Sequence, residues 1–368
     1  MTRRMRASSV CSEAWRDVVT GTGRPGLLAV LFLLVVGGVA AADVRAVVGV
    51  LDSAEQFRRS GAAVQVLEAG ADGGGAVDGA ACDALAGTDG VQAAGALRLA
   101  EPTRVATLPA QDLTTYEVTP GLLEVVREAG GRTAADAGAT GGLWLSADLA
   151  EVLGTRPGDE VLTRSGPATV AGVYRWPEDG RARSLGFAVL APVAAGGAFT
   201  QCWAQTWPVD EDVTGLLYTG ARAGRTADAT VAQLNPALGA AHPTPDLLAA
   251  RATALAPVAA AVAGLALGFG STRVRRLEIA SALHARVPRS HLTWQHLLET
   301  VAWLAAASLV AAAALVWVAG VGNPGPAWPT WVAGSRTLGA GAAAVVLGTL
   351  AGVAATRERH LFRYFKER

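Results

Sequence analysis

The chain has 368 residues, 31 basic and 31 acidic side chains, and a formal net charge of +0. Only 17% of its residues are charged and 51% are hydrophobic, whereas soluble globular chains carry about 25% charged residues. This composition argues against an ordinary soluble protein. The distribution of charge along the chain, an acidic middle between two basic ends, excludes a nucleic-acid binder that works through a basic domain.

The charges are unevenly distributed along the chain. Residues 1–42 carry 5 basic and 2 acidic side chains, residues 43–252 carry 15 and 25, and residues 253–368 carry 11 and 4. A middle segment with a net charge of −10 therefore separates two ends with net charges of +3 and +7. Each junction falls beside an apolar stretch, which is the pattern of a membrane protein.

Four apolar stretches are long enough, or nearly so, to cross a hydrocarbon core of about 30 Å as helices. The first also resembles a signal peptide, since arginines precede it and Ala40–Ala42 looks like a cleavage site. The long amphipathic segment before it favours a permanent anchor. Arginine clusters mark cytoplasmic segments, so we predict this order: cytoplasmic 1–24, span 25–42, external domain 43–251, span 252–272, cytoplasmic link 273–299, span 300–322, external loop 323–336, span 337–356 and cytoplasmic tail 357–368.

Small residues recur within the predicted spans. Gly264 and Gly268 in the second span, and Gly348 and Gly352 in the fourth, form G-x-x-x-G pairs that permit close helix packing. Spans this rich in alanine and glycine also produce such pairs by chance. No predicted span contains an internal ionisable residue, which argues against a secondary transporter.

The predicted external domain alternates strand-like and helix-like runs, which indicates an α+β fold. Ser146 is expected to cap a helix that ends at Gly154, because its hydroxyl accepts from a free N–H of the first turn. We predict strands at 62–67, 91–99, 143–145, 160–163, 168–174, 187–190 and 216–218, and helices at 77–85, 121–129, 148–153 and 228–234.

Three cysteines are present, and Cys11 lies on the predicted cytoplasmic side. Cys82 and Cys202 are the pair in the external domain, where oxidation is allowed. They form either a disulfide or two separately buried thiols.

No catalytic or metal site is evident in the sequence. The external domain has one histidine, His242, and its carboxylates form no recognisable pair. The one lysine in the chain is Lys366, so no G-x-x-x-x-G-K-[ST] loop exists and the chain is not itself a P-loop ATPase. We expect no cofactor bound by this chain, and any ATP-driven role requires a partner.

The predicted link contains an amphipathic helix with Leu277, Ala280 and Leu283 on one face. The R-R-x-E-I run at 275–279 and Glu299 at the third span resemble the cytoplasmic link of MacB/FtsX-type ABC transporter permeases. Residues 153–159 and 170–173 are similar to the L-G-x-x-P-G-D and V-V-G-V motifs of that family's periplasmic core domain. The order of spans and domain matches as well.

Two departures accompany this resemblance. The family has an A-L-G-A-like turn where this chain reads Ala285–Pro288, with Val287 near the expected glycine. The external domain is also poorly matched before Gly142.

The resemblance implies four transmembrane α-helices with an α+β extracytoplasmic domain between helices 1 and 2, in the plasma membrane of a bacterium with both termini cytoplasmic. It implies mechanotransmission: a separate cytoplasmic ATPase, which binds the ATP, pushes on the link and thereby moves the external domains of a permease pair. The pair is a homodimer or a heterodimer. The expected ATPase contacts are Arg275, Arg276, Glu278, Arg286 and Arg289.

Three functions fit these features. The leading prediction is a permease subunit that acts on a lipid, peptide or lipoprotein. An FtsX-like signalling adaptor, which controls a cell-wall hydrolase and transports nothing, is the alternative. A membrane-anchored enzyme with its chemistry in residues 43–251 is the third. Membrane lipid is an expected partner and nucleic acid is not.

Overall fold

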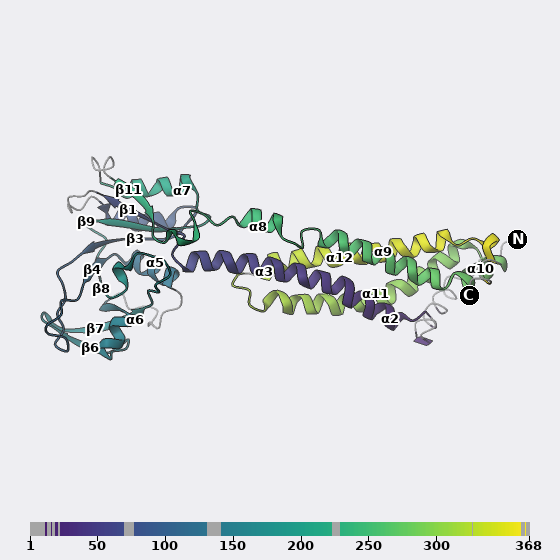
Figure 1. Ribbon diagram of the computed structural model, residues 1–368, viewed down its shortest axis with the longest axis horizontal. Coiled ribbons are helices and arrows are strands. Elements are labelled where there is room, and N and C mark those ends of the chain that lie inside the picture. Colours follow the sequence, from purple (N-terminus) through teal and green to yellow (C-terminus); the bar gives the residue numbers. More distant parts are fainter. Residues whose placement is uncertain are drawn as a thin grey trace. The chain divides into compact units, whose positions relative to one another are not determined.

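The computed structural model describes residues 23–69, 77–130, 141–222, 229–325 and 327–361, with residues 12, 16, 19, 20 and 365. The chain forms two compact units, each with its own core (Figure 1). The helical unit combines residues up to Asp52 with those from Thr244 onward, and the inserted domain is Ser53–Pro243. The predicted fold class, an α+β domain between the first and second of four apolar helices, is confirmed. Most of the predicted segment 1–24 lies outside the described residues.

Within the described part of the chain, four helices are long and apolar enough to cross a membrane. The first, called helix 1 below, is continuous over Pro25–Arg59 and extends well beyond the predicted end at 42. It comprises α2 (Pro25–Phe32), a π-helical segment (Leu33–Gly37) and α3 (Gly38–Arg59). The others are α9 (Ala256–Val274), α11 (Arg289–Gly320) and α12 (Ala327–Ala355). Residues 289–299 of the predicted link are therefore the first turns of α11.

Helices α9 and α12 approach each other backbone to backbone. The four glycines of the G-x-x-x-G pairs lie at this contact. A Cβ atom on Gly264 would lie 2.2 Å from the carbonyl oxygen of Gly341, and one on Gly268 would lie 2.0 Å from that of Val345. From the other side, a Cβ on Gly348 would lie 2.2 Å from the Leu265 oxygen. Only glycine permits this separation, because any side chain would have to occupy the space of the opposite backbone.

Helix α12 also packs closely against helix 1. A Cβ atom on Gly334 would lie 2.5 Å from Cγ2 of Val44, and one on Gly341 would lie 2.4 Å from Cγ1 of Val36. Gly341 thus belongs to both contacts. Helix α12 is therefore the element against which both helix 1 and α9 are positioned.

We predict that Gly268→Ala destabilises the helical unit by about 1–3 kcal/mol, because the added methyl group forces α9 and α12 apart. Gly270→Ala is the matched control, since a Cβ at Gly270 meets nothing within 4 Å. The thermal unfolding temperature of the full chain in detergent micelles measures the stability of both variants. Equal unfolding temperatures for the two variants would contradict the contact.

The inserted domain is built on a mixed sheet, nine-stranded among the described residues, in the order β11-β1-β10-β3-β4-β8-β5-β7-β6. The β4–β8 and β5–β7 pairs are parallel and the others antiparallel. The strands are β1 (Val64–Ala69), β3 (Val91–Leu99), β4 (Thr115–Val118), β5 (Leu143–Ser146), β6 (Glu160–Thr163), β7 (Gly166–Tyr174), β8 (Val189–Pro192), β10 (Gln201–Thr206) and β11 (Ala229–Gln233), with a separate pair β2 (Val77–Asp78) and β9 (Ala198–Phe199). The helices are α4 (Gly79–Ala84), α5 (Pro120–Gly130), α6 (Ala147–Leu153) and α7 (Glu211–Gly215).

Strand β3 separates two cores, because successive side chains of a strand point to opposite faces. Ala93 and Leu97 belong to the cluster that includes α5, and Ala94 and Ala96 belong to the cluster that includes Cys82 of α4. The strand is buried on both sides and reads as a nearly continuous apolar run. The prediction at 91–99 is confirmed for this reason.

Local signals around the predicted helix cap are also confirmed. The Ser146 hydroxyl accepts a hydrogen bond from the Leu149 N–H at 3.4 Å, and Gly154 ends α6 in the left-handed region with φ 65°. Strands β6 and β7 form the expected antiparallel pair.

Two element predictions are wrong. The predicted helix at 228–234 is strand β11, because alanines that favour a helix are overridden by antiparallel pairing with β1. The predicted strand at 216–218 is a 3₁₀ helix (Leu216–Gly220) that continues α7 and buries Leu217. Strands β2, β4, β9 and β10 were not predicted, and β2 occupies the first two residues of the predicted helix at 77–85.

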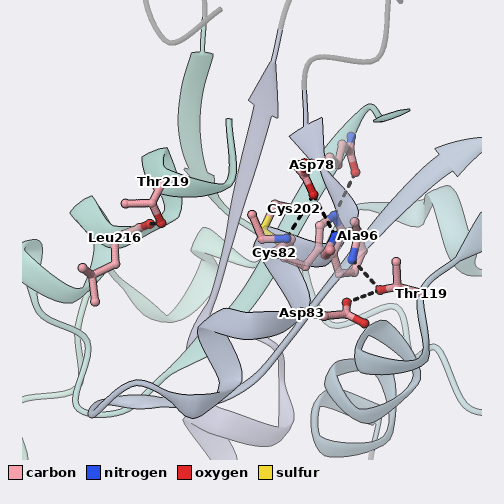
Figure 2. The surroundings of a disulfide bond; sticks show 12 residues. Asp78, Cys82, Asp83, Ala96, Thr119, Cys202, Leu216 and Thr219 are labelled. Atoms are coloured by element: carbon pink, nitrogen blue, oxygen red, sulfur yellow. Dashed lines mark hydrogen bonds between the residues drawn. A yellow bond between two sulfur atoms is a disulfide. The ribbon is translucent and has the colours of Figure 1, made fainter. Parts of the chain in front are cut away.

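Cys82 and Cys202 are bonded, with Cα atoms 5.8 Å apart and a separation of 120 positions in sequence. Figure 2 shows that the next residue, Asp83, faces the start of α5. Its carboxylate accepts a hydrogen bond from the Thr119 hydroxyl, which in turn accepts from the Ala96 N–H at 2.9 Å. Burial raises the pKa of the Asp83 carboxyl, although its hydrogen bonds act in the opposite direction. The disulfide therefore anchors α4 beside the residue that precedes α5.

We predict that replacing both Cys82 and Cys202 by alanine destabilises the inserted domain by about 2–5 kcal/mol, because the crosslink closes a long loop. Unfolding of the full chain in denaturant measures the loss. In a Cys11→Ser background, the unfolded chain should label two thiols only after reduction. Labelling without reductant would show that the bond is absent.

Candidate functional site

The candidate site is the link between α9 and α11, which contains the short helix α10 (Arg276–His284). Figure 1 shows α10 and α8 (Thr244–Ala250) at opposite ends of the helical unit. The buried residues of α10 are Ile279 and Ala280, and Ile279 packs with Leu292 of α11 and Val353 of α12. Leu277, predicted on the buried face, is only half-buried. Helix α10 therefore rests directly on two of the four apolar helices.

The end of α10 is a Schellman motif. Its defining hydrogen bonds are donated by the Val287 N–H to the Ala282 oxygen at 3.1 Å and by the Arg286 N–H to the Leu283 oxygen at 3.0 Å. Arg286 occupies the left-handed position with φ 61°, where glycine is favoured. The glycine-like position of the turn is thus Arg286 rather than Val287, and Val287 packs into the apolar cluster beneath α10.

Arg275 lies at the junction of α9 and α10, and its guanidinium forms ion pairs with two carboxylates of the helical unit. Its side chain is 14% exposed, its Nε donates to Oε2 of Glu278 at 2.8 Å, and its Nη1 contacts the buried Glu299. A Cβ on Gly23 would lie 3.3 Å from Nη1, so the segment before helix 1 passes close to this pair. Glu278 itself is 59% exposed. Arg275 therefore orients Glu278 and ties the link to α11.

The remaining predicted contact residues lie around α10. Arg286 and Arg289 are exposed, and Arg276 is partly exposed. We call Arg276, Glu278, Arg286 and Arg289 the link surface. At its edge, Nδ1 of His284 lies 3.0 Å from Oε1 of Glu358, which holds the end of α10 to the segment after α12. A mostly basic surface of this kind is electrostatically complementary to an acidic surface.

The inserted domain contains one histidine, His242. The Nε2 atom of His242 lies 3.2 Å from the Ser53 hydroxyl, and its ring contacts Phe57 and Trp207. Burial lowers the pKa of His242. Asp210 caps α7 by accepting from the Asp212 N–H. Among the described residues, no group of three or more His, Cys, Asp or Glu side chains is arranged to hold a metal ion.

The burial of Asp43 in the helical unit was not predicted from the sequence. The first predicted span ends at Ala42, so Asp43 was assigned to the external domain, yet it is 1% exposed inside helix 1. The apolar run that follows Arg45 was the available signal, because it continues the helix past the charge.

No protein-family model matches the chain, and no curated protein matches it. The similar solved structures include the periplasmic region of MacB from Actinobacillus actinomycetemcomitans, with 14% identity over 48% of this chain and 91% of that one, at a TM-score of 0.34. A domain of a putative permease protein from Porphyromonas gingivalis shares 13% identity over 48% and 92%, also at 0.34. The extracellular domain of the noncanonic ABC-type transporter YknZ from Gram-positive bacteria shares 17% over 46% and 98%, at 0.30. At these identities and TM-scores the likeness is one of shape over about half of the chain and assigns no activity.

We predict that Arg286→Gly stabilises the chain by about 1 kcal/mol, because glycine adopts the left-handed conformation without the Cβ clash that arginine meets. Arg289→Gly is the matched control. It makes the same substitution at the first residue of α11 and should not stabilise. Thermal unfolding of the full chain in detergent micelles measures both variants. A gain for Arg289→Gly, or none for Arg286→Gly, would contradict the assignment.

Proposed function

We propose that this chain is the permease subunit of an ABC transporter complex in the plasma membrane of a bacterium. A separate cytoplasmic ATPase binds the ATP and docks on the link surface, and its movement passes to the inserted domain outside the cell. The observation that carries the proposal is α10, which packs on α11 and α12 and is followed by the exposed Arg286 and Arg289.

Contacts within the helical unit give a route for this movement. Helix α10 contacts α12 through Ile279 and Val353, and α12 contacts both α9 and helix 1 through glycines. Close-packed interiors deform little, so a displacement of α10 moves its neighbours. Helix 1 is continuous to Arg59, whose carbonyl oxygen accepts from Nη2 of the buried Arg181 in the inserted domain at 2.9 Å. The last residues of helix 1, from Ser53 to Arg59, thus belong to the inserted domain.

The link surface supplies the proposed docking contacts. Arg276, Arg286 and Arg289 provide positive charge, and Glu278, held by Arg275, gives the surface an orientation. Arg275 contributes through this internal pair, so its reversal would disturb the link itself as well as a partner. The substrate class that fits the proposal is a lipid, peptide or lipoprotein, acted on by a homodimer or heterodimer of such permeases in contact with membrane lipid.

Purification of the full chain from its native membranes should recover a small ABC ATPase. We predict that the double variant Arg276→Glu, Arg286→Glu weakens this association by roughly tenfold or more, because charge reversal opposes an electrostatically complementary interface. Arg183→Glu is the matched control, since Arg183 is 81% exposed on the inserted domain. The amount of ATPase recovered per permease is the measurement.

Unchanged recovery after the double reversal would contradict the docking surface. Absence of any ATPase with the wild-type chain would contradict the proposed function. A cell-wall hydrolase recovered together with the ATPase, without ATP-driven movement of any substrate, would favour the signalling adaptor.

A further inference from the structure

Asp43 is a carboxylate buried within helix 1 of the helical unit, and its side chain is 1% exposed. A buried charge is strongly unfavourable unless it is paired and hydrogen-bonded. Here both carboxylate oxygens have a partner. Nε of Arg251 donates to Oδ1 at 3.0 Å, and the Thr337 hydroxyl donates to Oδ2 at 3.0 Å. One side chain thus joins three segments that lie far apart in the sequence.

These three segments have distinct roles in the chain. Asp43 lies on helix 1, which leads to the inserted domain, and Thr337 lies on α12. Arg251 directly follows α8, on the segment that returns from the inserted domain to α9, and its Nη1 also contacts the Leu248 oxygen. Both chain connections to the inserted domain therefore meet α12 at one carboxylate. We call Asp43, Arg251 and Thr337 the outer junction.

The packing around the outer junction leaves little freedom. Gly334, one turn before Thr337, brings α12 so close to helix 1 that a Cβ would lie 2.5 Å from Val44. The fully buried Thr337 hydroxyl can reach Asp43 because of this approach. Two residues beyond Asp43, Nη1 of Arg45 donates to the Val321 oxygen at the end of α11, at 2.7 Å. Helix 1 is thus held to α11, α12 and the returning segment within one turn.

We propose that Asp43 is a positioning residue: its ion pair with Arg251 and its hydrogen bond from Thr337 make both connections to the inserted domain move together with α12. A buried ion pair is weak evidence for net stability, but removing one partner leaves an unpaired buried group, so the register of the three segments depends on it. The inference rests on the proposed function only for the source of the movement.

Hydrogen–deuterium exchange of the full chain in phosphatidylethanolamine and phosphatidylglycerol vesicles tests the junction without nucleotide. Asp43→Asn should speed exchange in α8 (residues 244–250) by roughly tenfold or more, because the returning segment loses its anchor. Exchange in α10 should not change, since α10 packs elsewhere. Asp52→Asn is the matched control, because Asp52 is an exposed carboxylate on the same helix.

Two further variants separate positioning from a general loss of stability. Arg251→Lys keeps the cation and should hold exchange in α8 near the wild-type rate, whereas Arg251→Gln should match Asp43→Asn. Thr337→Val removes one hydrogen bond at nearly constant volume and should give an intermediate rate. Unchanged α8 exchange in Asp43→Asn, or equal acceleration in α8 and α10, would overturn the proposal.

The same vesicles with the co-purified ATPase and ATP test the coupling. In the wild-type chain, ATP should alter exchange in both α10 and residues 53–59, and Asp43→Asn should keep the first response and lose the second. An intact response at 53–59 in Asp43→Asn would also overturn the proposal. If the wild-type chain shows no response to ATP, the proposed function is contradicted, while the nucleotide-free arm still decides the junction.

Discussion

The backbone contact between α9 and α12 is the constraint on which the helical unit depends. In a hydrocarbon surrounding, helices gain little from burying apolar side chains, so close packing and hydrogen bonds must hold them together. Glycines at the contact bring the two backbones together, and Gly341 also faces Val36 of helix 1. The position of α12 therefore determines where α9 and helix 1 lie. Val353 of α12 also packs against α10.

Polar groups at the two ends of the helical unit add to this close packing of apolar helices. At one end Arg275 ties Glu278 and the buried Glu299 together, and at the other Asp43 joins Arg251. Directional, charge-assisted hydrogen bonds specify register where small apolar residues allow sliding. The apolar middle thus supplies contact, and the two polar ends specify how the helices are aligned.

The inserted domain forms its own compact unit and is held together by other interactions: helices packed on a sheet, a disulfide and buried hydrogen bonds. Its sheet is covered on one face by α5 and on the other by α4, and the disulfide secures α4. Arg181 holds the carbonyl oxygens of Ala129 and Arg59, so the end of helix 1 is part of this domain's hydrogen-bond network. The same helix therefore belongs to both units along its length.

Composition and local pattern predicted the features that depend on residues close together along the chain. Apolar length predicted four membrane-capable helices, and local chemistry predicted the Ser146 cap, the Gly154 stop and the β6–β7 pair. Features that depend on residues far apart along the chain could be seen only in the folded protein. Strand β11 exists because β1 lies beside it, and Asp43 is buried because Arg251 and Thr337, remote in sequence, satisfy its charge. A periodic pattern reports the environment of one segment and carries no information about which segment will pair with it, so these contacts required the fold.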